Sequence, residues 1–430
     1  MPVAPEALSE QARVGFRKQL TLSALWLGLN FQSAALLPIV VPAQLLLLVD
    51  RGAVASAAQA LTLSALSGAA AVAAIVVTPL AGVASDRLAR RSRGRHQLIV
   101  AGILIALIGQ AGLAATAPLL LFVGAFAIVQ VGTNAATAAY QGLLPDLVRK
   151  SQRGAASGWL GFMTIAGSVG SLATAGLLLG DVSAGPRLET EVTGGAAIFY
   201  VIAAAVLLLT MSVTVLGVRR PRPVSTPGSA EPWSRIIKYQ PFRVVFAARF
   251  FVMVGLTLFL TYIEYYLAQV NGSASFVGAT VSVALLALAG ALTSALVFGM
   301  ASDRIPRVNI VIGANLLMAA AAAIFVLAPA QFPLAPLGLL FGVGYGAYLS
   351  VDWALAIDSL PGPASSARDL GVFTVSINLP TLVAPALGGM VILVTGWLGI
   401  PGLAFRAIFA LAAVSLVAGI LAVRRLRLPA

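Results

Sequence analysis

The chain of 430 residues contains no cysteine and only one histidine, His96. Without cysteine it can form no disulfide, no thiolate metal site and no cysteine nucleophile. His96 stands in a strongly basic stretch, and no paired carboxylates, serine elbow or GxxxxGK phosphate loop accompany it. The sequence therefore predicts neither an enzyme nor a bound metal, cofactor or nucleotide.

Charge is also scarce, since only 10% of the residues are charged and 60% are hydrophobic. A soluble domain carries roughly a quarter of charged residues, so this composition indicates an integral membrane protein. A helix needs about 20 apolar residues to cross a bilayer. Twelve runs of that kind are present, near residues 20–46, 57–84, 97–116, 118–144, 153–179, 195–217, 242–269, 275–300, 308–328, 332–359, 367–394 and 402–423.

The formal net charge of +13 could suggest a nucleic-acid partner, but the positions of the basic residues argue for a membrane. If the N-terminus is cytoplasmic, 23 of the 27 lysines and arginines fall in cytoplasmic segments. Such asymmetry is typical of proteins whose basic loops stay inside. We therefore expect a multi-pass protein of the cell membrane with both termini in the cytoplasm, in contact with lipid and with no nucleic-acid partner.

The densest cluster of charge runs from Gly82 to His96, between the second and third apolar runs, and reads GVASDRLARRSRGRH. A second copy, GMASDRIPR, begins at Gly299, at a spacing of 217 residues (299 − 82). The two loops resemble the signature of the major facilitator superfamily of transporters. The SDR…RGR form is most similar to the branch of sugar/cation symporters and sucrose transporters. The residues that match are Gly82, Asp86, Arg87, Arg95, Gly299, Asp303 and Arg304.

This resemblance implies an all-α membrane protein with twelve transmembrane helices in two six-helix halves, related by a parallel pseudo-twofold repeat. The proline-rich, basic segment between the sixth and seventh runs is typical of a linker. We therefore expect an N-terminal half over 1–217, a central cytoplasmic linker over 218–241 and a C-terminal half over 242–430. The expected oligomeric state is a monomer.

The resemblance also implies a central cavity lined by the first, fourth, seventh and tenth helices. The candidate solute-binding residues on these helices are Asn30, Gln32, Gln130, Asn134, Tyr262, Tyr345, Tyr348 and Trp353. Amides, phenols and an indole suit a neutral, hydroxyl-bearing or amphipathic solute. Two alternatives stay open at this stage, because intramembrane amides also bond neighbouring helices and tyrosines near a helix end also form interfacial belts.

Three charged residues within the runs are candidates for proton coupling: Arg249, Glu264 and Asp352. Arg249 and Asp352 lie at similar depths from the cytoplasmic side, so they can form an ion pair that offsets the cost of burying each charge. Glu264 lies 15 residues beyond Arg249, about 22 Å along the helix, so it cannot share that partner. It is expected to be protonated, solvated or matched by a residue near the outer face such as Arg406. We expect Asp352 rather than Glu264 to carry the proton, the alternative being a structural ion pair.

The loop aspartates have a predicted role in gating. Asp86 can accept hydrogen bonds from the free N–H groups at the start of the eleventh helix, near residues 365–368, and Asp303 from those at the start of the fifth. These contacts would lock the cytoplasmic ends of the two halves together. A solvated loop carboxylate is the alternative.

The leading functional hypothesis is a secondary active transporter that moves a small organic solute, sugar- or glycoside-like, by proton-coupled alternating access. The second run has no acidic residue before Asp86, so the sodium site of melibiose-type symporters is not expected. A drug or metabolite efflux antiporter is the alternative, although the fifth run lacks the glycine-proline pair typical of that group. A receptor-like relative without transport is a further possibility.

Overall fold

The computed structural model describes residues 15–55, 59–90, 94–115, 118–179, 188–218, 233–271, 276–362, 366–398 and 402–426. Within those ranges the regular structure is entirely helical, and twelve segments are long and apolar enough to cross a membrane. The predicted all-α class and number of spans are therefore confirmed. Most of the predicted linker, at 219–232, lies outside the described residues.

The first six spans form the N-terminal half of the helix bundle. The first span is interrupted at its middle by a short π-helical segment that contains Pro38, a residue without the N–H that a regular helix requires. The elements are α1 (Phe16–Ala34), η2 (Leu36–Val40), α2 (Val41–Asp50), α3 (Gln59–Arg90), α4 (His96–Ala114), α5 (Leu119–Leu147), η4 (Lys150–Gln152), α6 (Arg153–Leu179) and α7 (Leu188–Gly217).

The last six spans form the C-terminal half. Its elements are α8 (Trp233–Lys238), α9 (Gln240–Tyr266), η5 (Leu267–Asn271), α10 (Phe276–Ala301), α11 (Arg307–Leu327), α12 (Ala335–Asp358), α13 (Ser366–Gly396) and α14 (Leu403–Val423). The helices follow the predicted spans closely. The largest difference is at α7, which starts before residue 195 because its first turn carries Glu189 and Glu191, favourable at a helix N-terminus but absent from an apolar run.

The side chains on the outside of the bundle suit a lipid environment. Leu120, Leu177 and Leu216 are more than four-fifths exposed although they are large and apolar. Inside the C-terminal half, Phe259 stacks on Phe341 with ring centroids 3.9 Å apart. Because lipid is as apolar as the core, close packing of this kind is the main attraction between the helices.

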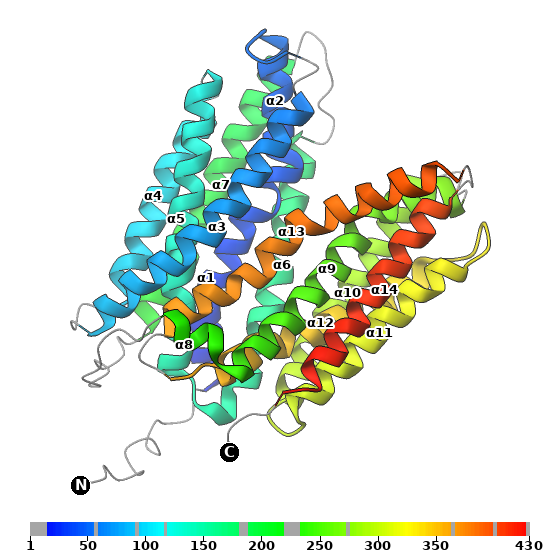
Figure 1. Ribbon diagram of the computed structural model, residues 1–430. Coiled ribbons are helices and arrows are strands. Elements are labelled where there is room, and N and C mark those ends of the chain that lie inside the picture. Colours follow the sequence, from blue (N-terminus) through cyan, green and yellow to red (C-terminus); the bar gives the residue numbers. More distant parts are fainter. Residues whose placement is uncertain are drawn as a thin grey trace.

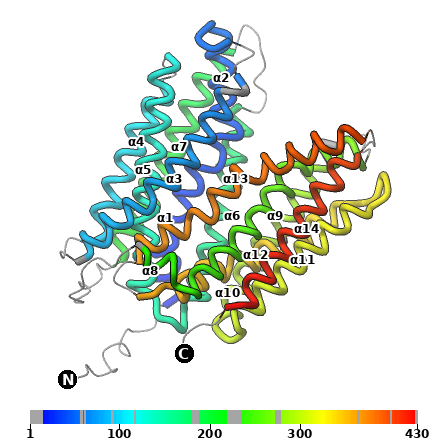
Figure 2. Tube along the Cα trace, viewed as in Figure 1, coloured from blue at the N-terminus to red at the C-terminus, as the bar shows by residue number. Residues whose placement is uncertain are grey.

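The two halves converge at one end of the molecule and diverge toward the other (Figures 1 and 2). We call the end that carries Arg95, Lys150 and Arg307 the basic end, and the other the far end. Across the boundary α3 packs along α13, and α6 packs against α10 and α12. A Cβ on Gly82 would lie 2.5 Å from the carbonyl oxygen of Ala367, so only glycine permits this crossing.

Candidate functional site: a central cavity closed at the basic end

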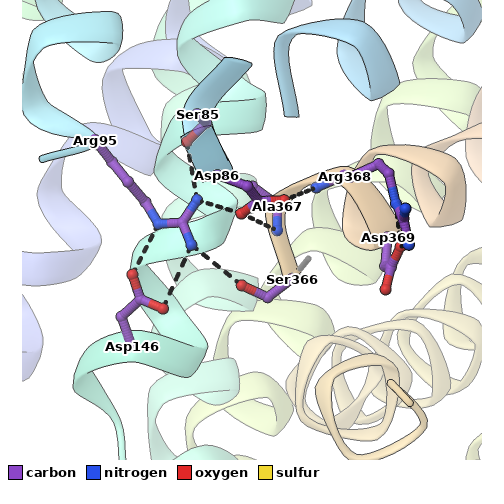
Figure 3. A network of polar contacts seen from close by, with 8 residues as sticks. All are labelled: Ser85, Asp86, Arg95, Asp146, Ser366, Ala367, Arg368 and Asp369. Carbon is purple, nitrogen blue, oxygen red and sulfur yellow. Dashed lines mark hydrogen bonds and ion pairs between the residues drawn. The ribbon is translucent and has the colours of Figure 1, made fainter. Parts of the chain in front are cut away.

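Arg95 is the centre of a buried polar network at the basic end of the N-terminal half (Figure 3). Its guanidinium donates to Asp86 Oδ1 at 2.8 Å and to Asp146 Oδ2 at 2.8 Å. It also donates to Ser85 Oγ at 3.0 Å and, across the boundary, to Ser366 Oγ at 3.3 Å. Burial acts to lower the pKa of Arg95, but the carboxylates of Asp146 and Asp86 raise it, and the net shift is upward.

Asp86 connects this network to the start of α13 in the other half. Its carboxylate accepts hydrogen bonds from the backbone N–H of Ala367 at 3.2 Å and of Arg368 at 3.0 Å. The predicted contact is therefore present, and it satisfies two of the free N–H groups of that helix. Arg87 is exposed and makes no hydrogen bond or ion pair with any described residue. Residue 365, named in the prediction, is not described.

The second loop makes the equivalent contact in the opposite direction. Asp303 accepts from the backbone N–H of Gly154 at 3.0 Å and of Ala155 at 3.3 Å, at the start of α6. Partial burial raises the pKa of Asp303, although these N–H groups and the nearby Arg307 act to lower it. This contact was also predicted. Arg304, like Arg87, is exposed.

Gly299 and Asp358 complete the closure. A Cβ on Gly299 would lie 2.5 Å from the Cα of Gly158, so these two glycines allow α10 and α6 to touch. Asp358, at the end of α12, pairs with Arg307 in its own half and, at 2.7 Å, with Arg153 in the other. Sequence reasoning missed Asp146 and Asp358 as parts of the site, although both end corresponding helices of the repeat.

Above this closure a cavity of about 430 Å³ lies between the halves. Its size falls within the range of small-molecule sites. The described lining comprises Trp26, Leu29, Asn30, Ser33, Leu36, Leu37, Ser67, Ala70, Ala71, Ala74, Gln130, Thr133, Asn134, Thr137, Gln141, Trp353, Thr374, Ile377, Asn378, Thr381 and Leu382. Four of the predicted solute-binding residues are therefore brought together, namely Asn30, Gln130, Asn134 and Trp353.

The other four predicted residues lie outside this lining. Gln32 is buried and donates from Nε2 to Thr133 Oγ1 at 2.9 Å, because it projects from a different face of α1 than Asn30 does. Tyr262 donates to the carbonyl oxygen of Pro385 at 3.2 Å. Tyr348 is buried in the hydrophobic core, and Tyr345 packs against a cluster that includes Ile165 of α6, so neither side chain is part of the described lining.

Sequence reasoning missed several lining residues. Gln141 accepts a hydrogen bond from Thr374 at 3.3 Å, which joins α5 to α13 at the cavity wall. Asn378 and Trp26 also line the cavity. The signal for Gln141 and Asn378 was present, since both are amides within apolar runs. The eleventh span is not among the four pore helices that the resemblance implies, but its two prolines, Pro380 and Pro385, predict a bent helix next to the cavity, and α13 does line it.

The predicted ion pair between Arg249 and Asp352 is confirmed, with a distance of 2.7 Å and both side chains 3% exposed. Tyr348 donates to the other carboxylate oxygen, Asp352 Oδ1, at 3.0 Å. The Arg249 guanidinium carbon lies 5.0 Å from the ring centroid of Trp353 and 4.4 Å from that of Phe373. The charged pair is thus held between two aromatic rings, beside the cavity rather than in it.

Glu264 has no such environment. It is exposed near the far end of α9, and its carboxylate forms no ion pair or hydrogen bond within the described part of the chain. The suggested match with Arg406 is not formed, since that guanidinium donates instead to the carbonyl oxygens of Val326 and Ala328 at the end of α11. The free carbonyls of a helix C-terminus attract a cation, which explains this preference.

Two six-helix halves around a polar central cavity, joined at one end of the bundle, are the architecture of membrane transporters built from parallel repeats. Comparison with known families agrees with this class. The family model of the Major Facilitator Superfamily matches residues 20–293 and 245–430. The chain belongs to this superfamily, and the predicted relationship is confirmed.

Solved structures show the same fold at low sequence identity. FucP in the outward conformation aligns with a TM-score of 0.74 and 15% identity, covering 99% of each chain. A bacterial homologue of the iron transporter ferroportin, in an outward-facing state, aligns at 0.72 and 14%, covering 95% of this chain and 98% of the other. The proton:xylose symporter XylE aligns at 0.70 and 14%, covering 94% of each. No curated protein sequence matches the chain.

Proposed function

We propose that this transporter moves a neutral, hydroxyl-rich solute, sugar- or glycoside-like, together with protons across the cell membrane. The observation that supports it most is the chemistry of the cavity. The described lining has no charged side chain, but it has five amides, Asn30, Gln130, Asn134, Gln141 and Asn378. An amide both donates and accepts, which matches the dual character of a hydroxyl group.

The rest of the lining favours a solute with an apolar face as well. Trp26 and Trp353 offer flat aromatic surfaces, and Ala70, Ala71 and Ala74 of α3 leave room on another side. A sugar ring has hydroxyls at its edge and C–H groups on its faces, so it can contact both kinds of surface. A strongly charged solute would have to be desolvated here without a countercharge, at high cost.

Asp352 is the residue to which we assign the coupling proton. It is buried in contact with Arg249 and Tyr348, so its charge depends on few neighbours, whereas the exposed Glu264 is free to interact with water. Among the similar structures, E. coli FucP is a fucose:proton symporter and XylE a proton:xylose symporter. Both are compatible with the proposed coupling.

We further propose that the halves are 1–217 and 242–430, joined by a linker at 218–241, and that the chain works as a monomer. The two halves move by alternating access, with the contacts at the basic end closing the cytoplasmic side. In the described arrangement Asp86 and Asp303 hold this end shut, which corresponds to a cavity facing outward.

Transport by purified protein in proteoliposomes tests the function. With an imposed inward proton gradient, radiolabelled D-xylose or L-fucose should accumulate in vesicles that contain the wild type. The Asp352→Asn variant should lose accumulation but retain exchange of labelled for unlabelled sugar, and Glu264→Gln should keep both. If both variants accumulate sugar, neither carboxylate carries the proton. If an outward-directed solute flux driven by proton entry is seen instead, the antiporter alternative holds.

The orientation of the protein in the membrane can be tested separately with single introduced cysteines, because the chain has no native cysteine that would react. Single cysteines at Lys150 and Arg304, both exposed at the basic end, should react with a membrane-impermeant maleimide only from the cytoplasmic side. Cysteines at Asp50 and Ala330, exposed at the far end, should react only from outside. Outside labelling at Lys150 would reverse the proposed topology.

A further inference from the structure

We propose that Trp353 links solute occupancy of the central cavity to the charge state of the Arg249–Asp352 pair. This inference rests on the proposed function and assigns a coupling role to one side chain. Trp353 follows Asp352 directly in α12 and is 4% exposed. Its indole lines the cavity and also lies against the guanidinium of Arg249.

The contacts of Trp353 extend in two directions. On the cavity side its ring meets that of Trp26, from the other half, edge to face at a centroid distance of 5.4 Å. On the other side it lies under the guanidinium of Arg249, 5.0 Å from the ring centroid to the guanidinium carbon. A solute that presses on the indole therefore acts on a ring that is already part of the ion pair's environment.

The indole also lies at a local packing defect. A second cavity of about 10 Å³, roughly the room for one water molecule, lies between the halves toward the basic end. Trp353 lines both this small cavity and the central one, and Arg153 lines the small cavity too. Trp26, in contrast, is fixed by a hydrogen bond of 2.7 Å from its indole N–H to Thr164 and by stacking on Tyr140.

The ion pair is sensitive to this ring because it has few other partners. Nε and Nη1 of Arg249 have no hydrogen-bond acceptor among the described residues, so the guanidinium is stabilised by Asp352 and the rings of Trp353 and Phe373. A cation–π contact that is shielded from water is stronger than one at an exposed site. Displacement of the indole thus changes how strongly Arg249 is held and how well it stabilises the Asp352 carboxylate.

Few titratable groups other than Arg249 face Asp352. Arg249 approaches from α9, and Tyr348 and Tyr345 belong to α12 itself. Of the other helices that pack on α12, α10 has no titratable side chain, and α6 and α11 have only Arg153 and Arg307, which pair with Asp358. In α13, Arg368 and Asp369 pair with each other near its start.

Three aromatic residues provide matched variants for the test. Trp353 contacts both the cavity and Arg249, Trp26 lines the cavity without contacting Arg249, and Phe373 contacts Arg249 without lining the cavity. In purified full-length protein, the dissociation constant for D-xylose or L-fucose is measured in mildly acidic and mildly alkaline buffer. Melting temperature and size-exclusion profile show which variants remain folded.

The wild type should bind sugar about tenfold more tightly in the acidic buffer, within the usual range of coupling between two sites. Trp353→Leu should bind with an affinity that does not depend on pH, and Trp353→Phe should restore part of the dependence. Trp26→Leu should bind more weakly at both pH values with the ratio unchanged, and Phe373→Leu should also keep a pH-dependent ratio. Wild-type pH dependence in folded Trp353→Leu overturns the proposal, as does equal loss in Trp26→Leu.

A measurement without sugar separates this inference from the proposed substrate. The tryptophan emission of the wild type should change with pH as Asp352 gains a proton. The change should be absent in Asp352→Asn and Trp353→Leu but present in Trp26→Leu. If no sugar binds the wild type while this pattern holds, the solute class is wrong but the link between indole and ion pair stands. An emission change that survives in Trp353→Leu overturns the link.

Discussion

The two loops at the basic end have the same sequence signature but different surroundings. In the first, Arg95 and Asp86 are 2% and 3% exposed, whereas in the second Arg307 and Asp303 are 13% and 20% exposed. Arg95 lies nine residues after Asp86, and Arg307 lies four residues after Asp303. In the shorter second loop Arg307 lies one helical turn after Asp303 and stays partly exposed. In the longer first loop Arg95 folds back into the interior.

The loops also cross the boundary between the halves in different ways. The ion pairs of Arg95 stay within the N-terminal half. The first loop crosses the boundary through hydrogen bonds to the start of α13, one donated by Arg95 and two accepted by Asp86. Next to the second loop, Asp358, which pairs with Arg307 of that loop, also forms an ion pair between the halves with Arg153. The two loops share a sequence signature but therefore contribute differently to the free energy of the closed arrangement. We expect the first loop to contribute more to stability and the second to be more easily opened.

Removal of the two arginines gives the largest expected difference. Arg95→Ala leaves Asp86 and Asp146 buried without their cation, and the loss of one partner of a buried pair costs about 3–5 kcal/mol. Arg307→Ala leaves Asp358 still paired with Arg153, so its cost should be about 1 kcal/mol or less. Thermal unfolding of the purified protein in detergent measures both. Equal destabilisation would show that burial does not distinguish the loops.

The aspartates give the next effect, on transport rate rather than stability. Asp86→Asn keeps a neutral acceptor for the N–H groups of α13 but loses the charge, which weakens the closed basic end. We expect turnover to fall about tenfold, from the loss of roughly 1.5 kcal/mol in charged hydrogen bonds, with solute affinity unchanged. Asp303→Asn should have a smaller effect because its carboxylate is more exposed.

Arg87→Gln is the matched control for these variants, since Arg87 is adjacent to Asp86 but exposed. It should transport like the wild type in the proteoliposome assay. Wild-type turnover in Asp86→Asn, or a greater loss of turnover in Asp303→Asn, would contradict the expectation that Asp86 contributes more than Asp303 to closing the basic end.

The smallest effect is expected from the ion pair between the halves. The Arg153 side chain is 19% exposed and Asp358 keeps Arg307 as a second partner, so the pairing of Arg153 with Asp358 contributes on the order of 0.5–1 kcal/mol and is screened by salt. Arg153→Gln should increase the labelling rate of a cysteine at Ser157, which lines the small inner cavity, by roughly threefold from the basic side. High salt should produce the same increase in the wild type and none in Arg153→Gln. Arg304→Gln, which removes an exposed arginine, should label like the wild type.

Much of the fold could be predicted because membrane insertion depends on composition. Twelve apolar runs and the asymmetry of arginine and lysine indicate the spans directly, since lipid tolerates neither charge nor unpaired backbone groups. The contacts of Asp86 and Asp303 could also be predicted. A carboxylate in a loop and the free N–H groups at a helix start are complementary, and the repeat places them in register.

The cavity was harder to predict, as Asn30 and Gln32 illustrate. Both are amides in the same span, yet Asn30 lines the cavity and Gln32 hydrogen-bonds Thr133. Uniformly apolar helices give little periodic signal about which face turns toward a neighbour. The polarity of a residue therefore identifies it as a candidate for the cavity lining, but the rotation of its helix determines whether it faces the cavity.

The sequence by itself determined the helices, the repeat and the pairing of Arg249 with Asp352, because local hydropathy and the cost of an isolated buried charge require them. Only the tertiary structure decided which residues of α13 line the cavity, that Arg153 reaches Asp358 and that Trp353 lies between the central cavity and the ion pair. These contacts depend on the tilt and rotation of whole helices packed against each other. That geometry comes from close packing summed over many residues, and no single stretch of sequence specifies it.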